Sequence, residues 1–394
     1  MVSGCAEPQP VKIAKPPVAV PAPPPSTVAT HPLTGEEGGF ARLGNIPAGH
    51  TPIRIGVLLP FGNGSPATRA LANSLMKAAE LALFESKNRD LMLISADEGY
   101  GRETAASGAR NLLAQGAEVI IGPLFAQSVS AVAPITRDHG VPLISFSTDI
   151  SVAGDGVYLL SFQPGNEVRR VVKYAATQGH SNFAALIPAT VYGERVEAAF
   201  RSSVKAAGAQ IADVEKFTPA AGDIVTPAQQ VAKAKPDSIL IAQGGSLLSD
   251  IAPTLSTSGA GSHQVQYLGT GLWDDPAISR EPNLAGGWFA APDPEAERAF
   301  EARYHATFGT NPAQLAALGY DAVSLVALLA SGPAYHRFTP QTLTDPNGFS
   351  GADGIFRFNS DGTCERGLAI LGVDPDEGFK LISPAPTTFQ GTPS

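Results

Sequence analysis

The chain has 394 residues, of which 43% are hydrophobic, 16% are charged and 7% are aromatic, and its formal net charge at pH 7 is -9. This composition is typical of a globular protein, and the length favours two compact units over one large core. The acidic residues are scattered and no basic run offers a footprint for phosphates, so nucleic acid is not expected as a partner. No run reaches the roughly 18 apolar residues that a membrane-spanning helix requires.

The first 52 residues are expected to lie outside the folded body. From Ala6 to about His50 the chain is rich in proline, alanine and valine, with prolines at 16, 17, 21, 23, 24 and 25. Proline lacks a backbone N–H and fixes φ, so it opposes helix and sheet interiors. We therefore expect residues 1–52 to form a semi-extended, disordered tether that makes few contacts with the body.

A short motif precedes this tether. Val2-Ser3-Gly4-Cys5 resembles the lipobox of bacterial lipoproteins, in which the cysteine carries the lipids; the alternative is a chance cysteine. The resemblance implies that Cys5 is the lipid attachment site, and Ala6 resembles lipoproteins sent to the outer membrane. Because Met1 leaves no room for a secretory signal, we expect the natural precursor to start further upstream. The expected location is the periplasm, with an outer-membrane anchor.

From Ile53 onward the pattern alternates between strand and helix. The run Ile53–Leu59 is apolar and β-branched and is ended by Pro60, as expected for a strand buried on both faces. The elements predicted after it are helix 69–86, strand 91–95, helix 102–115, strand 119–122, helix 127–138 and strand 142–146. This order predicts right-handed βαβ units and a parallel sheet.

A second series of the same kind follows and predicts a second parallel sheet. Its elements are helix 166–178, strand 183–187, helix 192–207, strand 211–217, helix 227–234, strand 238–242 and helix 246–255. Strand-like segments at 265–269 and 287–290 precede two longer helices at 295–308 and 313–330. Short strands at 355–358, 368–373 and 379–382 close the chain.

The order of these segments resembles the type I periplasmic-binding-protein superfamily, which includes leucine-binding proteins. The resemblance is carried by IRIGVLLPF, LLSFQPGNEVRRVVKYAATQG, AALIPATVYGERVEAAF and LGYDAVSLVALL. It implies an α/β fold of two lobes, each a parallel sheet flanked by helices, joined by three crossovers that act as hinges. The expected first lobe comprises 53–161 and 294–350, and the expected second lobe comprises 162–293 and 351–394.

Within that superfamily, the segment GPLFAQSVSAVAPITRDHGVPLISFSTD and the lipobox with its tether are more similar to lipoproteins known as penicillin-binding protein activators. Transport receptors usually carry an Asn-Ala-Ala-Gly-Gly-like turn after the first helix. The corresponding stretch here is Ser86-Lys87-Asn88-Arg89-Asp90. This departure weakens the transfer of amino-acid binding from those receptors to this chain.

The expected ligand site lies where parallel strands end, because loops there present helix N-termini. Ser128, Ser145 and Ser147 match by position the loops in which leucine-binding proteins hold their ligand, and Tyr192 matches a tyrosine of the other lobe. Each has a simpler alternative, since serines also cap helices and stabilise turns, and a tyrosine can belong to the core. The full expected set, facing across an interlobe groove, is Ser128, Ser145, Ser147, Tyr192, Gln243 and Thr270.

Catalysis is not expected. Gly62-x-Gly64-x-x-Ala67 formally fits a dinucleotide fingerprint, but Pro60 and Phe61 separate it from the strand and Asp97 comes too late. No nucleophile elbow, P-loop or zinc-protease motif occurs, and neither cysteine has a metal partner at ligand spacing, so no cofactor and no metal site are expected. The pair Asp274-Asp275 lies in a turn before Pro276 and does not resemble an acid and base pair.

With catalysis set aside, two non-catalytic functions are considered. The first hypothesis is a non-catalytic, lipid-anchored activator of penicillin-binding proteins, whose partner is a peptidoglycan synthase and which regulates peptidoglycan synthesis. The alternative is a substrate-binding receptor of an ABC transporter, whose partner is the permease and whose cleft closes on an amino acid or amide, a small zwitterionic ligand. Fold alone does not decide between them.

Overall fold

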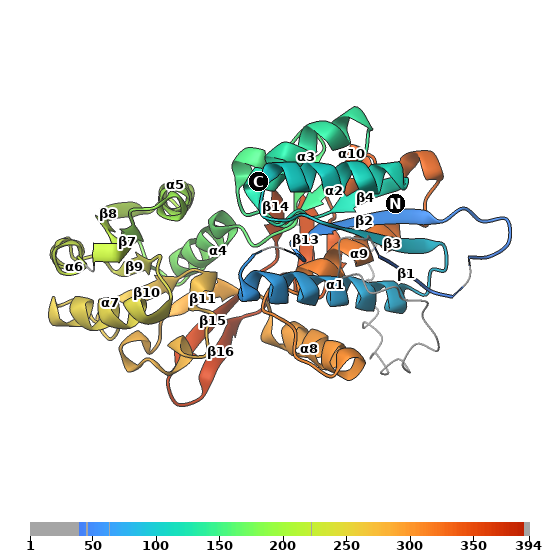
Figure 1. Cartoon of the computed structure of the whole chain (residues 1–394). Coiled ribbons are helices and arrows are strands. Elements are labelled where there is room, and N and C mark those ends of the chain that lie inside the picture. Colours follow the sequence, from blue (N-terminus) through green and yellow to red (C-terminus); the bar gives the residue numbers. More distant parts are fainter. Residues whose placement is uncertain (1–38, 45, 63, 222, 390–394) are drawn as a thin grey trace, which may run out of the picture.

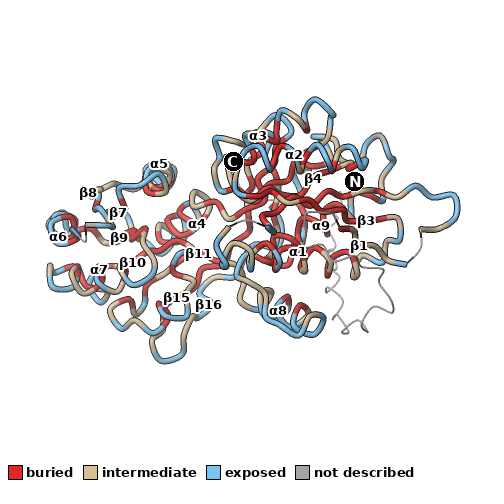
Figure 2. Tube along the Cα trace, viewed as in Figure 1, coloured by how far each residue is buried: buried red, intermediate tan, exposed pale blue. Residues whose placement is uncertain are grey.

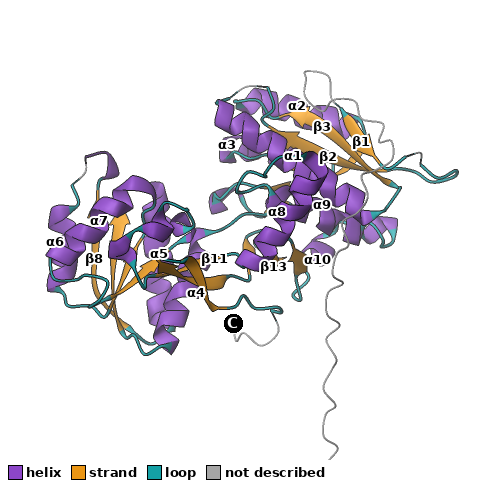
Figure 3. Ribbon diagram, turned by 90° about the horizontal axis from the view of Figure 1, so that it is seen from below, coloured by secondary structure: helices purple, strands orange, loops and turns teal. Residues whose placement is uncertain are grey.

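The computed structural model describes residues 39–389, except 45, 63 and 222. Cys5 and residues 1–38 of the predicted tether lie outside this described part. Within it, no helix combines the length and the hydropathy needed to cross a bilayer. Two lobes lie side by side, each with a central sheet and helices on both faces (Figure 1, Figure 3), and the buried residues follow the strands and the inner faces of the helices (Figure 2).

The first lobe is built on a six-stranded sheet with the order β1-β3-β2-β4-β5-β6. Its strands are β1 Phe40–Arg42, β2 Ile53–Leu59, β3 Leu91–Asp97, β4 Ala117–Ile121, β5 Leu143–Ser145 and β6 Val157–Leu159. All pairs are parallel except β1 with β3. Apolar side chains of α1 Pro66–Ser86, α9 Ala317–Leu329 and the short α10 Pro340–Leu343 belong to one core cluster, and those of α2 Arg102–Ala114 and α3 Ala126–Asp138 to another. Helix α8 Pro294–Phe308 packs outside α1.

The second lobe is built on a seven-stranded sheet with the order β16-β15-β11-β10-β9-β7-β8. Its strands are β7 Asn182–Pro188, β8 Gln210–Phe217, β9 Ser238–Ile241, β10 Gln266–Gly269, β11 Trp288–Ala291, β15 Ala369–Asp374 and β16 Gly378–Ser383. Helices α4 Pro164–Thr177 and α5 Val191–Ala206 contribute to one core cluster. Helices α6 Val225–Lys233 and α7 Gly245–Thr257 contribute to another.

The two-lobed α/β fold is confirmed, but the expectation of wholly parallel sheets is wrong. Strand β15 pairs antiparallel with β11, and β16 pairs antiparallel with β15. The turn between β15 and β16 is too short for the crossover that a parallel pair requires, so these two strands form a hairpin. Both sheets are therefore mixed, with parallel pairs in the majority.

The chain passes between the lobes three times, after β6, after β11 and after β14, as expected. Before the third crossover, β12 Phe349–Gly351, β13 Gly354–Phe358 and β14 Cys364–Arg366 form a small antiparallel sheet. Phe349, Phe356 and Phe358 belong to the core of the first lobe. The expected lobe boundary after residue 350 therefore cuts this small sheet, because its alternating apolar side chains bury against the first lobe.

A buried ion pair lies next to the crossovers. Arg366, at the end of β14, donates from Nη2 to Oδ2 of Asp321 at 3.1 Å, and the two side chains are 1% and 0% exposed. The backbone N–H of Ala352 donates to the other oxygen of Asp321. The Arg366 guanidinium also lies 4.4 Å from the ring centroid of Phe162, in the first crossover. The pair thus connects two of the three segments that join the lobes.

The prediction that residues 1–52 make few contacts is wrong for the part that the structure describes. Strand β1 pairs with β3, and Ala41 is fully buried in the first core. Gly39 also exchanges hydrogen bonds with Ser95, at its backbone and its hydroxyl. Residues 38–46 contain no proline, so their N–H groups are free to join the exposed edge of β3.

The Glu80 carboxyl in the first lobe is largely buried. Glu80, on α1, takes no hydrogen bond from the described residues, and burial raises its pKa to about 7, with the Lys77 charge opposing. A carboxyl whose folded pKa exceeds its unfolded value binds a proton more readily in the native state. Its contribution to stability is fully present below the unfolded pKa, near 4.5, and is lost as the pH rises through 7.

We expect Glu80→Gln to stabilise the protein relative to the parent at pH 8 and much less at pH 5. The expected gain across this interval is about 1 to 3 kcal/mol, because ionised Glu80 no longer has to be buried. Urea unfolding at both pH values measures the effect. Glu103→Gln, at a side chain that is 94% exposed, is the control and should show no such pH dependence. An equal change for Glu80→Gln at both pH values would contradict the prediction.

Candidate functional site

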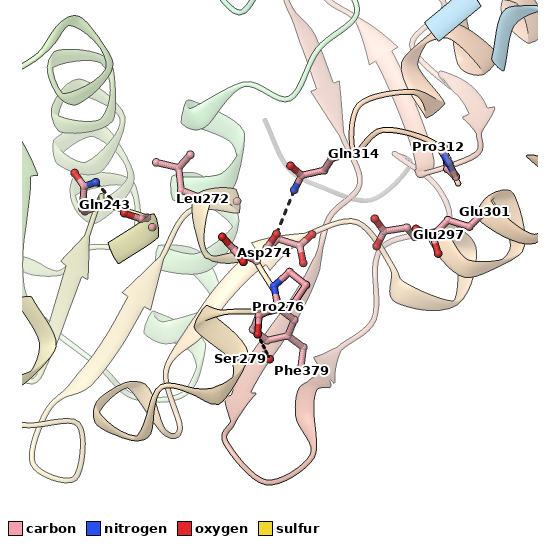
Figure 4. A pocket seen from close by; sticks show the side chains of 14 residues that line it. Gln243, Leu272, Asp274, Pro276, Ser279, Glu297, Glu301, Pro312, Gln314 and Phe379 are labelled. Atoms are coloured by element: carbon pink, nitrogen blue, oxygen red, sulfur yellow. Dashed lines mark hydrogen bonds between the residues drawn. The ribbon is translucent and has the colours of Figure 1, made fainter. Parts of the chain in front are cut away.

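A cavity of about 930 Å³ lies between the two lobes (Figure 4). The second lobe contributes loops after β9 and β10 and a residue of β16, and the first lobe contributes α8 and the segment before α9. The lining residues are Gln243, Gly244, Gly245, Gly271, Leu272, Asp274, Asp275, Pro276, Ser279, Glu297, Glu301, Pro312, Gln314 and Phe379. The cavity thus opens where two parallel strands end, which is the usual ligand position in such sheets.

The loops of the second lobe are held by a buried tryptophan. Trp273, in the turn after β10, is fully buried and donates from Nε1 to the backbone oxygen of Gln243 at 3.0 Å. This hydrogen bond joins the loop after β9 to the loop after β10. Gly244 and Gly245, which follow Gln243 at the start of α7, line the cavity, and no side chain caps this end of the helix. The Trp273 ring itself packs in the core of the second lobe.

Two sets of polar contacts join the lobes, one at Asp274 and one at Asp149. Gln314, before α9, donates from Nε2 to the backbone oxygen of Asp274 at 3.2 Å (Figure 4). Arg195, on α5, donates to the Asp149 carboxylate at 2.6 Å and to the backbone oxygen of Thr148 at 3.1 Å. Hydroxyl donation from Ser151 lowers the pKa of Asp149, and Arg195 contributes to the same shift. Such partly exposed contacts contribute about 0 to 1 kcal/mol each, so they can break when the lobes move apart.

The cavity is acidic. Asp274, Asp275, Glu297 and Glu301 line it, and none of its lining residues is Lys, Arg or His. Burial raises the pKa of Glu297 to about 7 and that of Asp274 to about 6, and neighbouring carboxylates add to both shifts. Behind the wall, buried Glu167 accepts from the backbone N–H of Gly271, and its pKa is raised to about 7, mainly by burial.

The predicted serines of the first lobe are engaged within their own lobe. The Ser145 hydroxyl donates to the Pro123 backbone oxygen at 2.8 Å and accepts from the Ser147 N–H. The Ser147 hydroxyl accepts from the Asp149 N–H at 3.1 Å. These contacts are those of a turn, which was the simpler alternative for both residues.

Ser128 and Glu98 lie together at the start of α3. Glu98 is fully buried and accepts from the N–H groups of Leu124 and Phe125 at 2.8 and 3.0 Å. Burial raises its pKa to about 7 against the effect of these donors. The Ser128 hydroxyl lies close to this carboxyl, but outside hydrogen-bonding geometry. The anion-binding end of α3 is therefore occupied by the chain's own carboxylate.

The turn that presents these N–H groups depends on Gly122. Its φ is +89°, and a Cβ added there would lie 2.0 Å from the Leu58 backbone oxygen. Any other residue would be strained in this conformation and would overlap β2.

The three predicted residues of the second lobe lie near one another. The Tyr192 hydroxyl is 2.8 Å from the Thr270 hydroxyl, and burial raises the Tyr192 pKa. Thr270 is fully buried, whereas Gln243 lines the cavity. Of the six predicted residues, only Gln243 lines this cavity, and no contact in the described residues brings the three serines against the other three. The six-residue site therefore stays a prediction.

Sequence analysis did not single out Glu297, Glu301 or Gln314. They lie on α8 and before α9, in segments whose sequence carries a helical pattern but no signal for a site. Asp274 was expected only in a turn beside Asp275, and the structure half-buries it. The only sequence signal that could have found these residues is the acidic character of both the loop at 274–275 and α8.

Two α/β lobes joined by three crossovers, with a cavity between them at the carboxyl ends of parallel strands, define a bilobal ligand-binding protein. The profile of a family described as periplasmic binding protein matches residues 52–378. The chain belongs to this family of binding proteins, which agrees at the family level with the expectation of no catalysis. A search of curated protein sequences gave no match.

Solved structures with the same fold cover most of the chain. A putative branched-chain amino acid ABC transporter protein from Rhodospirillum rubrum has a TM-score of 0.75 at 20% identity and covers 84% of this chain and 100% of its own. A branched-chain amino acid ABC transporter periplasmic ligand-binding protein from Burkholderia xenovorans has a TM-score of 0.71 at 19% identity, covering 86% and 97%. A leucine-binding protein from Thermotoga maritima has a TM-score of 0.58 at 19% identity, covering 84% and 99%.

Proposed function

We propose that this chain is the substrate-binding receptor of an ABC transporter and that its two lobes close on a small solute in the interlobe cavity. The observation that carries the proposal is a cavity of about 930 Å³ lined by both lobes, a size within the range of small-molecule sites. The family and the names of the solved relatives support it. They favour this alternative over activation of a penicillin-binding protein.

The contacts between the lobes are weak enough for the lobes to open and close around a solute. Arg195 with Asp149 and Gln314 with Asp274 are polar, partly exposed and few, so opening would cost little. A ligand that touches both lobes binds only the closed form and shifts the population toward it. The three crossovers are the segments that would absorb the motion.

We expect that a solute from a panel of amino acids, amides, amines and aromatic acids raises the melting temperature of the full chain. A ligand at one hundred times its Kd stabilises by about 2.7 kcal/mol. Small-angle scattering with the same solute should show a smaller radius of gyration, because the lobes close. Absence of both stabilisation and compaction across the panel would contradict the receptor function.

Activation of a peptidoglycan synthase stays a prediction, as do lipid attachment at Cys5 and anchoring to the outer membrane. The family implies a periplasmic location. Addition of the full chain to a purified peptidoglycan synthase tests the activator hypothesis directly, since stimulation that does not depend on any solute would favour it over the receptor function.

A further inference from the structure

The carboxylates of the cavity have no partner of opposite charge on its wall. Asp274 and Glu297 take no hydrogen bond at their carboxylates from the described residues, and they come from different lobes (Figure 4). The one lobe contact at Asp274 uses its backbone oxygen, not its side chain. Asp275 accepts from the N–H of Ala277, which fixes its orientation in the loop. Two unpaired carboxylates thus converge on the cavity from the two lobes.

A third carboxyl group lies near them. Asp353, in the turn between β12 and β13, is 3% exposed and accepts no hydrogen bond from the described residues. Burial raises its pKa to about 8, the charges of Asp321, Glu297 and Asp274 add to the shift, and the Arg366 charge opposes it. Its carboxyl is therefore close enough to both cavity carboxylates to interact with them electrostatically. A positive group in the cavity would offset the mutual repulsion of these three carboxyls.

A positive group in the cavity is better supplied by an organic cation than by a metal ion. No group of three or more His, Cys, Asp or Glu in the described residues could hold a metal. An ammonium or guanidinium carries three to five N–H donors on an extended group and can contact carboxylates that are several ångströms apart.

The first lobe does not provide the usual place for a ligand's own carboxylate. Glu98 already occupies the N–H groups at the start of α3. A carboxylate on the ligand would instead meet the start of α7, where Gly244 and Gly245 line the cavity without a side-chain cap. The positive charge is therefore the required feature of the ligand, and a carboxylate is optional.

We propose that the interlobe cavity binds an organic cation, an amine or guanidine of metabolite size, with Asp274 and Glu297 as its ionic partners and the buried Asp353 near them. This inference rests on the proposed receptor function and narrows its substrate class. The inferred class differs from the branched-chain amino acids that the names of two of the relatives mention.

Calorimetry on the full chain with agmatine, putrescine and arginine, against leucine, glutamate and benzoate, tests the inference. We expect at least one cation to bind at least tenfold more tightly than leucine. Asp274→Asn and Glu297→Gln should each weaken that binding by about 10-fold or more, the effect of losing a charged hydrogen bond. Asp250→Asn on α7 and Glu295→Gln on α8, both exposed and outside the cavity lining, are the matched controls and should leave affinity unchanged.

The melting temperature of each variant separates binding from folding. Removal of one of several repelling carboxylates should leave stability unchanged or higher, so weaker binding by a stable variant supports the ionic role.

Tighter binding of leucine, glutamate or benzoate, unaffected by Asp274→Asn, would overturn the cation site while leaving the receptor function intact. Binding of none of the six solutes would also overturn it, and the wider panel with scattering then decides the receptor function separately. Displacement of the cation by calcium at equal concentration would indicate a metal site instead.

Discussion

Replacement of Arg366 by methionine is expected to destabilise the folded protein by about 3 to 5 kcal/mol, because it leaves the Asp321 carboxylate buried without its partner. Asp321 is fully buried and would retain only the Ala352 N–H as a donor. Asp353 would lose the nearest positive charge as well, since Arg366 lowers its pKa. The guanidinium also lies over the rings of Phe162 and Phe356. Guanidinium chloride unfolding of the full chain measures the loss.

A double variant separates the unpaired charge from the lost packing. Arg366→Met combined with Asp321→Asn should recover a substantial part of the stability, since no isolated charge is then buried. Arg201→Met, at an exposed pair with Glu197 on α5, is the control and should cost less than about 1 kcal/mol. If Arg366→Met costs no more than Arg201→Met, the buried pair does not stabilise this junction of the lobes.

Gly122→Ala is expected to destabilise the protein by about 2 to 4 kcal/mol, from the strained φ together with the steric overlap. The residue has a φ of +89°, and the added methyl group would lie 2.0 Å from the Leu58 backbone oxygen. Backbone atoms of a central strand cannot rotate away as a flexible side chain would. The turn carrying the N–H groups that bind Glu98 should therefore shift, and thermal or urea unfolding should show the loss.

A second glycine provides the comparison. Gly101, before α2, has extended backbone, and a Cβ there would meet no atom within 4 Å. Gly101→Ala should change stability by less than about 1 kcal/mol. Equal unfolding midpoints for the two variants would show that the turn at Gly122 is not constrained by β2.

The long elements were predictable because each carries enough residues to display a period. Strand β2 begins and ends at the predicted residues, Ile53 and Leu59, and α2 and α3 agree to within a residue at each end. Four strands of three residues were missed: β1, β6, β12 and β14. Three residues show no clear alternation, and these strands form only because an existing strand offers a free edge.

The candidate site was predictable only in part. Gln243 and Asp274 follow strands of one sheet, so the general rule for parallel strands places them at one edge. For Ser145 and Ser147 the sequence left a ligand contact and a turn as alternatives, because nothing in a sequence tells whether a hydroxyl points to a cavity or to its own turn. The role of Glu98 was not predicted, because its bonds to the N–H groups of Leu124 and Phe125 depend on how two loops approach each other.

The sequence by itself determined that the chain alternates strands and helices, that these form two α/β lobes, and that the lobes join by three crossovers. Local periodicity and the order of elements carry the alternation, whereas the lobes and their three crossovers were what the resemblance to type I periplasmic binding proteins implied. Only the tertiary structure decided that Asp274 and Glu297 line one cavity and that Asp353 lies near them. These residues are separated by tens of positions and belong to segments on either side of crossovers, so their shared surroundings arise from the packing of whole lobes rather than from any local pattern.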